Sequence, residues 1–406
     1  MAKAFHLATL AALAVVASGT TFAQTVRIGV ILPYSGVSAE LGTQIDKAID
    51  LYVKLHAKDI APYKVELIKR DEGSPSGASA KIVATELITR DKADILTGLA
   101  FSPSAIAIAP VLTQAKKPLA IANAGTAWIP KLSPYIVRYS FSMWHAAYPM
   151  GEYAAQKLGC RTASIGYTDY PPGKDSAEAF RTGFEKHGGK ILDTIPLGNP
   201  AQVPDMTPFF TRVKDAKPDC FFVFVPSGPH SAAIVKYYGE VGLKAAGIRL
   251  IGTTDLMVDS KLATMGLEAN DAIGTIVMGN YSRDFTNSEN KAFVAAWEAE
   301  YGKTLVPDFM SAQGWDAMAA IFAAIRELKG DFSDGDKVIE VLKRYKASGP
   351  RGEIAIDPAT RDIVQDEHAM QVVKRPDGTL GLSVLDTIKA VRDPCKDLKI
   401  GRCGGD

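Results

Sequence analysis

The sequence predicts an α/β protein built from two doubly wound parallel-sheet lobes that are joined by a multi-strand hinge. Strands and helices alternate along the first part of the chain, and the alternation then starts afresh. Such alternation is typical of parallel sheets covered by helices on both faces. The length of 406 residues suits two domains of about 100–200 residues each.

The first 23 residues have the features of a secretory signal peptide. Lys3 supplies the positively charged N-terminal region, and residues 7–17 are apolar except for Thr9. Thr21 and Ala23 then place small side chains at the −3 and −1 positions of a cleavage site after Ala23. The apolar run is shorter than the roughly 20 residues that a membrane-spanning helix needs. We therefore expect export to the periplasm; a buried N-terminal helix is the alternative.

The first unit opens with a strand and a helix that has a single apolar stripe. The residues of this stripe recur at helical spacing: Leu41, Ile45, Ala48, Ile49 and Tyr52. We expect strands at 26–32, 65–70, 93–99 and 118–122, and helices at about 41–52, 79–91 and from 102. This order predicts a parallel sheet.

The second unit repeats the pattern and ends in helices and a hairpin. After a strand at 136–141, we expect strands at 163–167, 191–196, 221–225, 250–253 and 275–278, and helices at 148–158, 176–187 and 231–241. Longer helices follow at 289–301, 312–328 and 336–345, and antiparallel strands at 352–391 turn at Asp377-Gly378. Because these late elements have no sheet of their own, we expect lobe 1 at 24–142 and 284–355, and lobe 2 at 143–283 and 356–406.

Charge and motifs exclude several classes of function. The 46 Lys and Arg residues balance 45 Asp and Glu residues, which argues against nucleic-acid binding. The nearest approach to a phosphate loop, from Gly166 to Asp175, has six residues between its glycines where a P-loop has four, and it ends in an acid. Dinucleotide, nucleophile-elbow and zinc-protease motifs are missing from the sequence. We predict no enzyme activity, no cofactor and no metal.

Four cysteines remain in an exported chain, where pairing is the default. Four cysteines allow three connectivities. We favour Cys395–Cys403, which closes a short loop, and Cys160–Cys220, which precede two strands of one predicted sheet.

Two loops rich in hydrogen-bond donors end neighbouring strands of the first unit. Ser102 can cap the following helix, with Pro103 at its first position, and a helix N-terminus can hold a carboxylate. In the next loop, Gly125 admits close backbone approach and Thr126 offers a second donor. The alternative for Ser102 is a plain cap without ligand. Pro110 should kink or end the same helix.

The second unit has polar residues at equivalent strand ends. These are Thr168, Tyr170, Thr254, Asp255, Asn280 and Tyr281. Asp255 either contacts a ligand or caps a helix that starts at Leu256.

Taken together, these motifs resemble the periplasmic solute-binding proteins of ABC transporters, of the leucine/isoleucine/valine-binding type. The resemblance covers nearly all of the mature chain. It rests on the order and spacing of several short stretches: Leu32 to Gly36, Asp71, Gly98 to Ser104, Ala124 to Thr126, Asp169-Tyr170 with Gly173, and Gly252 to Asp255.

The resemblance implies two lobes that close on a small solute and then dock on an ABC permease. It implies that Ser102, Gly125 and Thr126 hold a carboxylate, that Tyr170 and Tyr281 close over it, and that Asp255 lies where relatives receive an ammonium. Leu41 stands where relatives can have an aromatic residue, whereas Phe101 lies beside Ser102 and Trp144 near the hinge.

We therefore expect a small carboxylate ligand, with a hydroxybenzoate-like acid favoured. A branched-chain or other apolar amino acid is the alternative, and a sensing subunit for a membrane receptor is a further one. We expect the protein to be a monomer.

Overall fold

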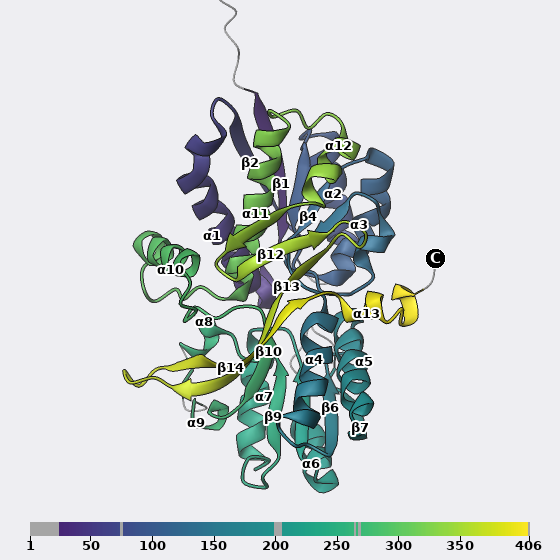
Figure 1. Ribbon diagram of the computed structural model, residues 1–406, viewed down its shortest axis with the longest axis vertical. Helices are drawn as coiled ribbons and strands as arrows, with labels where there is room; N and C mark the ends of the chain where they lie inside the picture. The colour runs from purple at the N-terminus through teal and green to yellow at the C-terminus, as the bar shows by residue number, and fades with distance from the viewer. Residues whose placement is uncertain (1–23, 74–75, 199–204, 264, 267–268, 405–406) are drawn as a thin grey trace, which may run out of the picture.

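The fold contains two β-sheets, one in each lobe, and the lobes follow each other along the long axis of the molecule (Figure 1). The computed structural model describes residues 24–73, 76–198, 205–263, 265–266 and 269–404. The expected signal peptide, residues 1–23, lies outside the described residues. The domain boundaries expected above stay a prediction.

The first sheet has five parallel strands in the order β2-β1-β3-β4-β5. Its strands are β1 (Thr25–Leu32), β2 (Lys64–Asp71), β3 (Ile95–Gly98), β4 (Leu119–Ile121) and β5 (Ile136–Arg138). The helices after them are η1 (Gly36–Ser38), α1 (Ala39–His56), η2 (Ala57–Ile60), α2 (Ala78–Thr89), α3 (Ser102–Ala115) and η3 (Ile129–Leu132). This strand order is that of a doubly wound fold, as the alternation predicted.

The second sheet has nine strands, in which five parallel strands are extended by antiparallel ones. The parallel strands are β6 (Thr162–Tyr167), β7 (Lys190–Pro196), β8 (Cys220–Phe224), β9 (Arg249–Thr253) and β10 (Ile276–Gly279). The antiparallel strands are β11 (Lys346–Gly349), β12 (Gly352–Asp357), β13 (Asp362–Lys374) and β14 (Leu380–Val391). The five residues of β8 are all buried, because this strand lies inside the sheet with helices on both faces.

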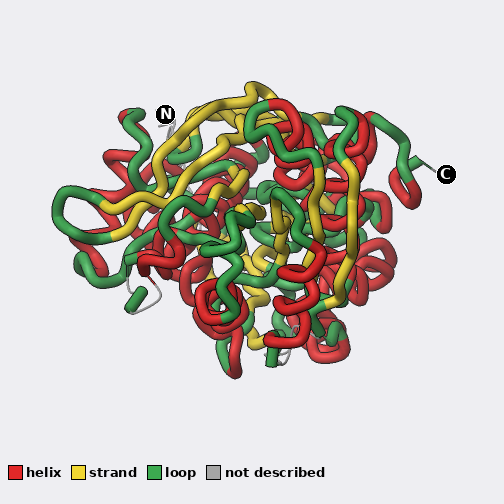
Figure 2. Tube along the Cα trace, turned by 90° about the horizontal axis from the view of Figure 1, so that it is seen from below, coloured by secondary structure: helices red, strands yellow, loops and turns green. Residues whose placement is uncertain are grey.

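Helices flank the second sheet, and the long β13–β14 hairpin extends from one side of the molecule (Figure 2). The helices of this lobe are α4 (Met143–Gln156), α5 (Pro171–Lys186), α6 (Thr207–Ala216), α7 (Pro229–Glu240), α8 (Asp259–Leu262) and α9 (Ala269–Ala272). The late helices are α10 (Ser288–Tyr301), α11 (Phe309–Glu327), α12 (Gly335–Leu342), α13 (Pro394–Asp397) and η4 (Gly401–Cys403).

Helices α10 and α11 pack against α1 of the first lobe. The hydroxyl of Tyr301 donates to the carbonyl oxygen of Lys47 at 2.8 Å, and Gly314 in α11 lies against Ile45. The amide of Gln44 donates to Val306 O at 3.0 Å. These segments, far apart in the sequence, therefore share one core.

One helix starts earlier than predicted, one does not end at the proline where an end or a kink was expected, and one was not predicted. Helix α4 begins at Met143, five residues before the predicted start, because Ser142 N donates to His145 Nδ1 at 3.1 Å and so caps the first turn. Helix α3 continues past Pro110 to Ala115. Pro110 is exposed, so water can replace the backbone bond that its ring removes. Helix α6 was not predicted.

The favoured disulfide connectivity is confirmed. The Cα atoms of Cys160 and Cys220 are 6.1 Å apart, and those of Cys395 and Cys403 are 5.8 Å apart, both within the usual range.

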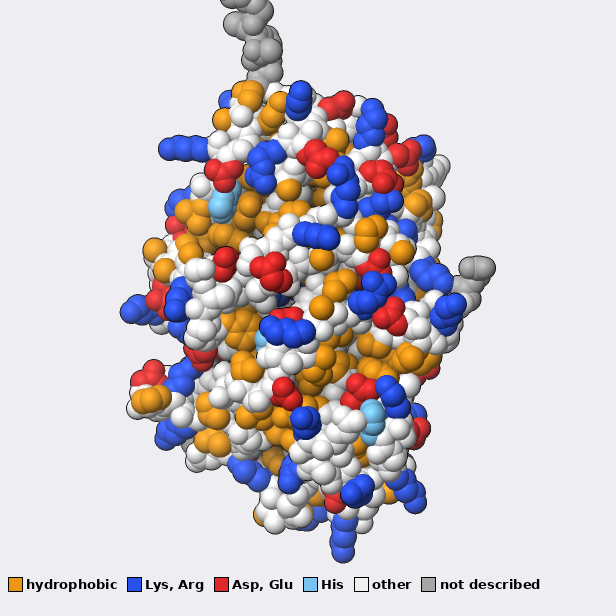
Figure 3. Space-filling model, viewed as in Figure 1, with side chains coloured by type: hydrophobic (Ala, Val, Ile, Leu, Met, Phe, Trp, Pro, Cys, Tyr) orange, Lys and Arg blue, Asp and Glu red, His pale blue; other side chains and the backbone are white. Residues whose placement is uncertain are grey.

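The surface mixes both signs of charge, and no large single-sign field is visible on the face shown (Figure 3). Among the described residues, none of the helices has the length and apolar character needed to cross a bilayer.

Two glycines let α4 and α5 approach each other closely, and they give a test of this packing. A Cβ at Gly151 would lie 2.3 Å from Phe180 O, and one at Gly183 would lie 2.2 Å from Tyr148 O. Alanine in place of a mid-helix glycine ordinarily stabilises by about 0.5–1 kcal/mol. Here we expect Gly151→Ala to lower the free energy of unfolding by about 1–3 kcal/mol, measured by urea denaturation.

The matched control is Gly239→Ala in α7, where the three atoms nearest to the new methyl group all belong to the side chain of Asp271. That carboxylate can move, so stability should change little. A Gly151→Ala variant as stable as the parent would contradict the close packing of the two helices.

Candidate functional site

The two lobes meet where the carboxyl ends of their parallel strands face each other (Figure 1). Contacts cross between the lobes on both sides of this cleft. On one side Ala127 N donates to Asp175 Oδ2 at 2.7 Å. On the other side Ser260 Oγ donates to Asp308 Oδ2 at 2.7 Å, and Lys261 pairs with Glu40. The lobes are therefore closed on each other.

A buried glutamate shapes the first donor loop, which follows β3. Glu72 is fully buried, and its Oε1 accepts from Ala100 N at 2.8 Å. The amide of Asn123 donates to Ala100 O at 2.9 Å. Burial raises the pKa of Glu72 to about 8, so this carboxyl is largely protonated at neutral pH.

Ser102 is the first residue of α3 rather than its cap, so the predicted capping role was wrong. Phe101 occupies the N-cap position, with no side-chain cap. Ser102 Oγ instead accepts from Thr126 N at 3.0 Å. Its own proton is then free to be donated to a ligand. Thr126 Oγ1 is buried, and no atom of the described residues pairs with it.

Gly125 packs closely against the second lobe. A Cβ there would lie 2.6 Å from Met143 Cε, and Met143 N donates to Gly125 O at 2.8 Å. Phe101 is buried at 4% exposure. The structure thus brings the loops of Phe101, Ser102, Gly125 and Thr126 together, as the sequence predicted.

The second lobe presents two tyrosines. Tyr170 precedes α5, and its ring stacks on Phe224 with a centroid distance of 6.2 Å. Tyr281 follows β10, is 1% exposed, and its hydroxyl has no partner within the described ranges. Further side-chain polar atoms at these strand ends are buried and likewise unpaired there: Thr168 Oγ1, Thr254 Oγ1, and both amide atoms of Asn280.

Asp255 does not cap a helix, so that alternative was wrong. Residues 254–256 form a turn, and the next helix, α8, starts at Asp259. The carboxylate of Asp255 accepts from Thr253 Oγ1 at 2.9 Å. Burial raises the pKa of Asp255 to about 7, and the negative charge of Asp308 adds to this increase.

Two further buried acids, which the sequence analysis missed, lie near Tyr281. Burial raises the pKa of Asp259 to about 7 and that of Asp308 to about 6. Burial also raises the pKa of Tyr281, and both carboxylates add to this increase. Asp308 is the N-cap of α11, where it accepts from Met310 N at 3.0 Å. In the described part of the chain no three His, Cys, Asp or Glu side chains are arranged to hold a metal ion.

Leu41 and Trp144 line different cavities. Leu41 borders a void of about 10 Å³ between the lobes, room for about one water molecule. Trp144 is buried, stacks on Tyr148 at 6.3 Å between centroids, and borders a cavity of about 430 Å³ together with Trp128 and Arg402.

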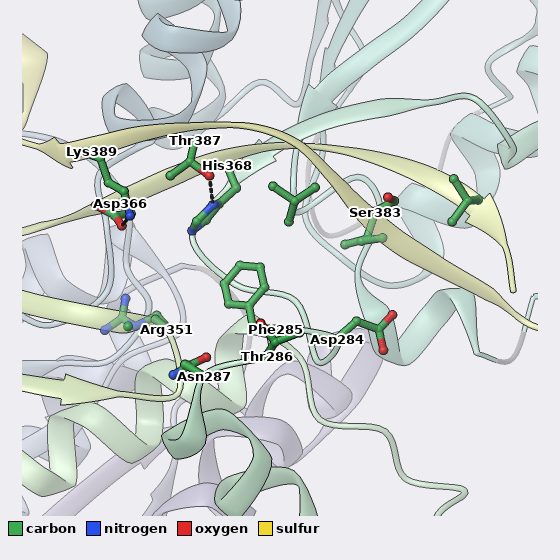
Figure 4. Close-up of a pocket in the computed structure, with 14 residues that line it drawn as sticks. Asp284, Phe285, Thr286, Asn287, Arg351, Asp366, His368, Ser383, Thr387 and Lys389 are labelled. Atoms are coloured by element: carbon green, nitrogen blue, oxygen red, sulfur yellow. Dashed lines mark hydrogen bonds and ion pairs between the residues drawn. The ribbon is translucent and has the colours of Figure 1, made fainter.

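A cavity of about 640 Å³ lies against β13 and β14 (Figure 4). His368 and Phe285 face each other in it, with ring centroids 4.7 Å apart, and His368 Nδ1 bonds with Thr387 Oγ1 at 2.9 Å. None of the predicted site residues lines this cavity.

Asp308 and Glu72 are buried acids that the sequence did not lead us to expect, and only one of them could have been found from a sequence pattern. Asp308 is of a residue type that is favoured at helix N-caps and directly precedes α11, so its capping role could have been found. Glu72 follows Asp71 at a strand end, where charged residues usually face solvent, and only the tertiary structure buries it.

Comparisons with known proteins agree with this geometry. The family model described as periplasmic binding protein matches residues 25–378. A protein of Brucella melitensis called Leu/Ile/Val-binding protein homolog 6 is 33% identical over 387 residues, which are 95% of this chain and 97% of that protein.

Two solved structures from Rhodopseudomonas palustris are similar over most of the chain. One, from strain BisB5, is a solute-binding protein of an ABC transporter in complex with 3,4-dihydroxybenzoic acid. It is 40% identical with a TM-score of 0.85 and covers 92% of this chain and 99% of its own. The other, in complex with 4-hydroxybenzoate, is 35% identical with a TM-score of 0.86 and covers 91% of this chain and 98% of its own.

The raised pKa of Glu72 predicts a pH dependence of stability. The folded state holds a proton that the unfolded state releases above about pH 4.5. The stabilisation is therefore complete below that pH and is lost as pH rises towards 8. Glu72→Gln should reduce the fall in unfolding free energy between pH 5 and pH 7.5 by on the order of 2 kcal/mol, measured by urea denaturation at both values.

Glu185→Gln, at an exposed position in α5, is the control and should leave that fall unchanged. An identical pH dependence in Glu72→Gln and the parent protein would mean that Glu72 is ionised in the folded state.

Proposed function

We propose, from the premise that this chain belongs to the periplasmic binding protein family, that it captures an aromatic acid of the hydroxybenzoate class. It does so in the periplasm and presents the acid to an ABC permease. In this proposal the chain catalyses no reaction, acts as a monomer, and loses its leader after Ala23.

The observation that carries the proposal is a set of polar atoms at the strand ends of both lobes that are buried and have no partner among the described residues. Thr126 Oγ1 lies in the first lobe, and Thr254 Oγ1 and the Tyr281 hydroxyl lie in the second. Buried polar groups nearly always have partners, and unpaired ones call for an explanation. A ligand between the lobes with polar atoms at both ends supplies those partners.

The donors of the first lobe suit a carboxylate. The Ser102 hydroxyl is free to donate because its oxygen already accepts from Thr126 N, and α3 presents its N-terminus at the same point. The rings of Phe101, Tyr170 and Tyr281 are apolar partners for an aromatic ring, each contact contributing about 0.5–1.5 kcal/mol beyond area burial. Both aromatic-acid complexes named above are 35% or more identical to this chain.

The mechanism is a population shift. The open form exposes the first-lobe donors, and closure adds Tyr170 and Tyr281 and excludes water, so a ligand that contacts both lobes favours the closed form. The permease then recognises the closed form. A sensing subunit for a membrane receptor would use the same shift.

A branched-chain or other apolar amino acid is the second candidate, and Asp255 favours it. This buried carboxyl has only the Thr253 hydroxyl as its side-chain partner among the described residues, and an ammonium group would compensate its charge. The name of the Brucella relative points in the same direction.

A calorimetric titration of the ligand-free protein tests the proposal. We expect 4-hydroxybenzoate to bind and leucine to bind more weakly or not at all, with each ligand recovered chemically unchanged. Ser102→Ala should weaken 4-hydroxybenzoate binding by about 1.5–3 kcal/mol, roughly tenfold to a hundredfold, because the ligand carboxylate loses a donor.

The control is Ser133→Ala, which removes a buried first-lobe hydroxyl that bonds with Thr113 outside the cleft. This variant should bind 4-hydroxybenzoate as tightly as the parent protein does. Tight binding of leucine with no response to aromatic acids would replace the proposal by the second candidate.

Asp255→Ala separates the two candidates directly. An amino acid should lose binding altogether, because its ammonium loses its counter-charge, whereas an aromatic acid should bind equally well or better. In the parent protein the pKa of about 7 adds a pH test. Amino-acid affinity should rise as Asp255 ionises between pH 6 and pH 8, and aromatic-acid affinity should stay flat or fall. The isosteric Asp255→Asn variant is the control for the lost volume.

A further inference from the structure

A buried arginine holds the loop that ends the first donor site. Arg138, the last residue of β5, has no exposed surface. Its guanidinium donates to three carbonyl oxygens of the loop formed by residues 123–127, here called the ligand loop. The acceptors are Thr126 O at 2.7 Å, Ala127 O at 3.1 Å and Ala124 O at 3.3 Å.

The charge of Arg138 is balanced by acids from outside the first sheet. Asp362 Oδ1 lies 2.5 Å from Arg138 Nε, and Asp393 Oδ2 lies 3.8 Å from Nη2. Lys396 pairs with Asp362 in the same cluster. Asp362 begins β13, and Asp393 caps α13 in the C-terminal tail.

Strand β13 extends from one lobe to the other. At its start, Arg138 N donates to Arg361 O at 3.0 Å, beside the first sheet. Further along, β13 pairs with β10 in the second sheet, where Gln371 lies opposite Ile276. Asp362 therefore connects Arg138 with a strand that spans the hinge.

The bonds of Arg138 fix the direction in which the amides of the ligand loop point. In a planar trans peptide the C=O and the next N–H point in opposite directions. With Ala124 O and Thr126 O held by Arg138, the N–H groups of Gly125 and Ala127 point away from it. Ala127 N then reaches Asp175 of the second lobe at 2.7 Å.

We infer that Arg138 is a positioning residue for ligand binding: it orients the ligand loop and ties that loop to the hinge strand through Asp362. The inference rests on the proposed function in taking the ligand loop as part of the carboxylate site. Arg138 itself lies behind the loop and contacts the ligand only through it.

Arg138→Lys compared with Arg351→Lys tests the inference. Arg351 is an equally buried arginine that bonds with Asp316, Gln365 and Tyr139 O and with no atom of the ligand loop. Both variants keep the charge, and both should lower the melting temperature. Only Arg138→Lys should raise the Kd for 4-hydroxybenzoate, by roughly tenfold or more, in calorimetry at a temperature where all variants are folded.

Hydrogen–deuterium exchange of peptides covering residues 123–127 gives a readout that does not depend on a ligand. Exchange there should be faster in Arg138→Lys than in Arg351→Lys, while exchange in β8 stays the same in both. If the parent protein binds none of the acids offered, the proposed function fails, but the exchange comparison still decides the role of Arg138.

Equal affinity in Arg138→Lys and the parent protein, or an equal loss in both variants, would overturn the inference. If Arg138→Lys does not fold, the acidic partners of the two arginines give the same comparison. Asp362, the partner of Arg138, is then changed to Asn, and Asp316→Asn, at the partner of Arg351, is the control. Asp362→Asn should then raise the Kd and the loop exchange rate more than Asp316→Asn does, and the reverse order would overturn the inference as well.

Discussion

The orientation of two parallel sheets is the constraint on which the rest of this structure depends. The carboxyl ends of both sets of parallel strands face the other lobe (Figure 1), so the loops that carry the polar side chains lie where the two lobes meet. Turning either sheet around would move its polar loops to the far end of its lobe, away from the loops of the other lobe. The cleft, the contacts that cross it and the need for a hinge all follow from that orientation.

Burial of polar groups between the lobes is the cost of this arrangement. Glu72, Asp255, Asp259 and Asp308 are all held away from water, and burial raises the pKa of each. Hydroxyl and amide groups at the strand ends are buried there without protein partners in the described ranges. A cleft of this kind is more stable with a polar ligand inside it than without one, which is the thermodynamic condition for capture by closure.

Ion pairs of Arg138 connect the ligand loop with the hinge strand β13 and with the C-terminal tail. Arg138, Asp362, Asp393 and Lys396 form one buried cluster behind the ligand loop, and the disulfide Cys395–Cys403 lies in the same tail. Removing one member of a buried cluster leaves an uncompensated charge, which is far more costly than losing a surface pair. The loop is thus held by Arg138, whose acidic partners Asp362 and Asp393 lie more than 200 positions away from it in the sequence.

The sequence by itself determined the doubly wound fold, nearly every strand and the two donor loops, whereas it only favoured one of three disulfide connectivities, which the structure then confirmed. These depend on local periodicity and on the rule that strand ends of parallel sheets lie together, and both are visible in residues such as Leu41, Ile45 and Ser102. It misplaced the start of α4 and left open whether Pro110 would kink or end α3, because a cap formed with His145 and an exposed Pro110 depend on surroundings that the pattern does not contain. Only the tertiary structure decided which charges are buried. Glu72, Arg138 and Asp308 look like ordinary polar residues in the sequence, and their desolvation and their partners arise from segments that meet only in the folded chain.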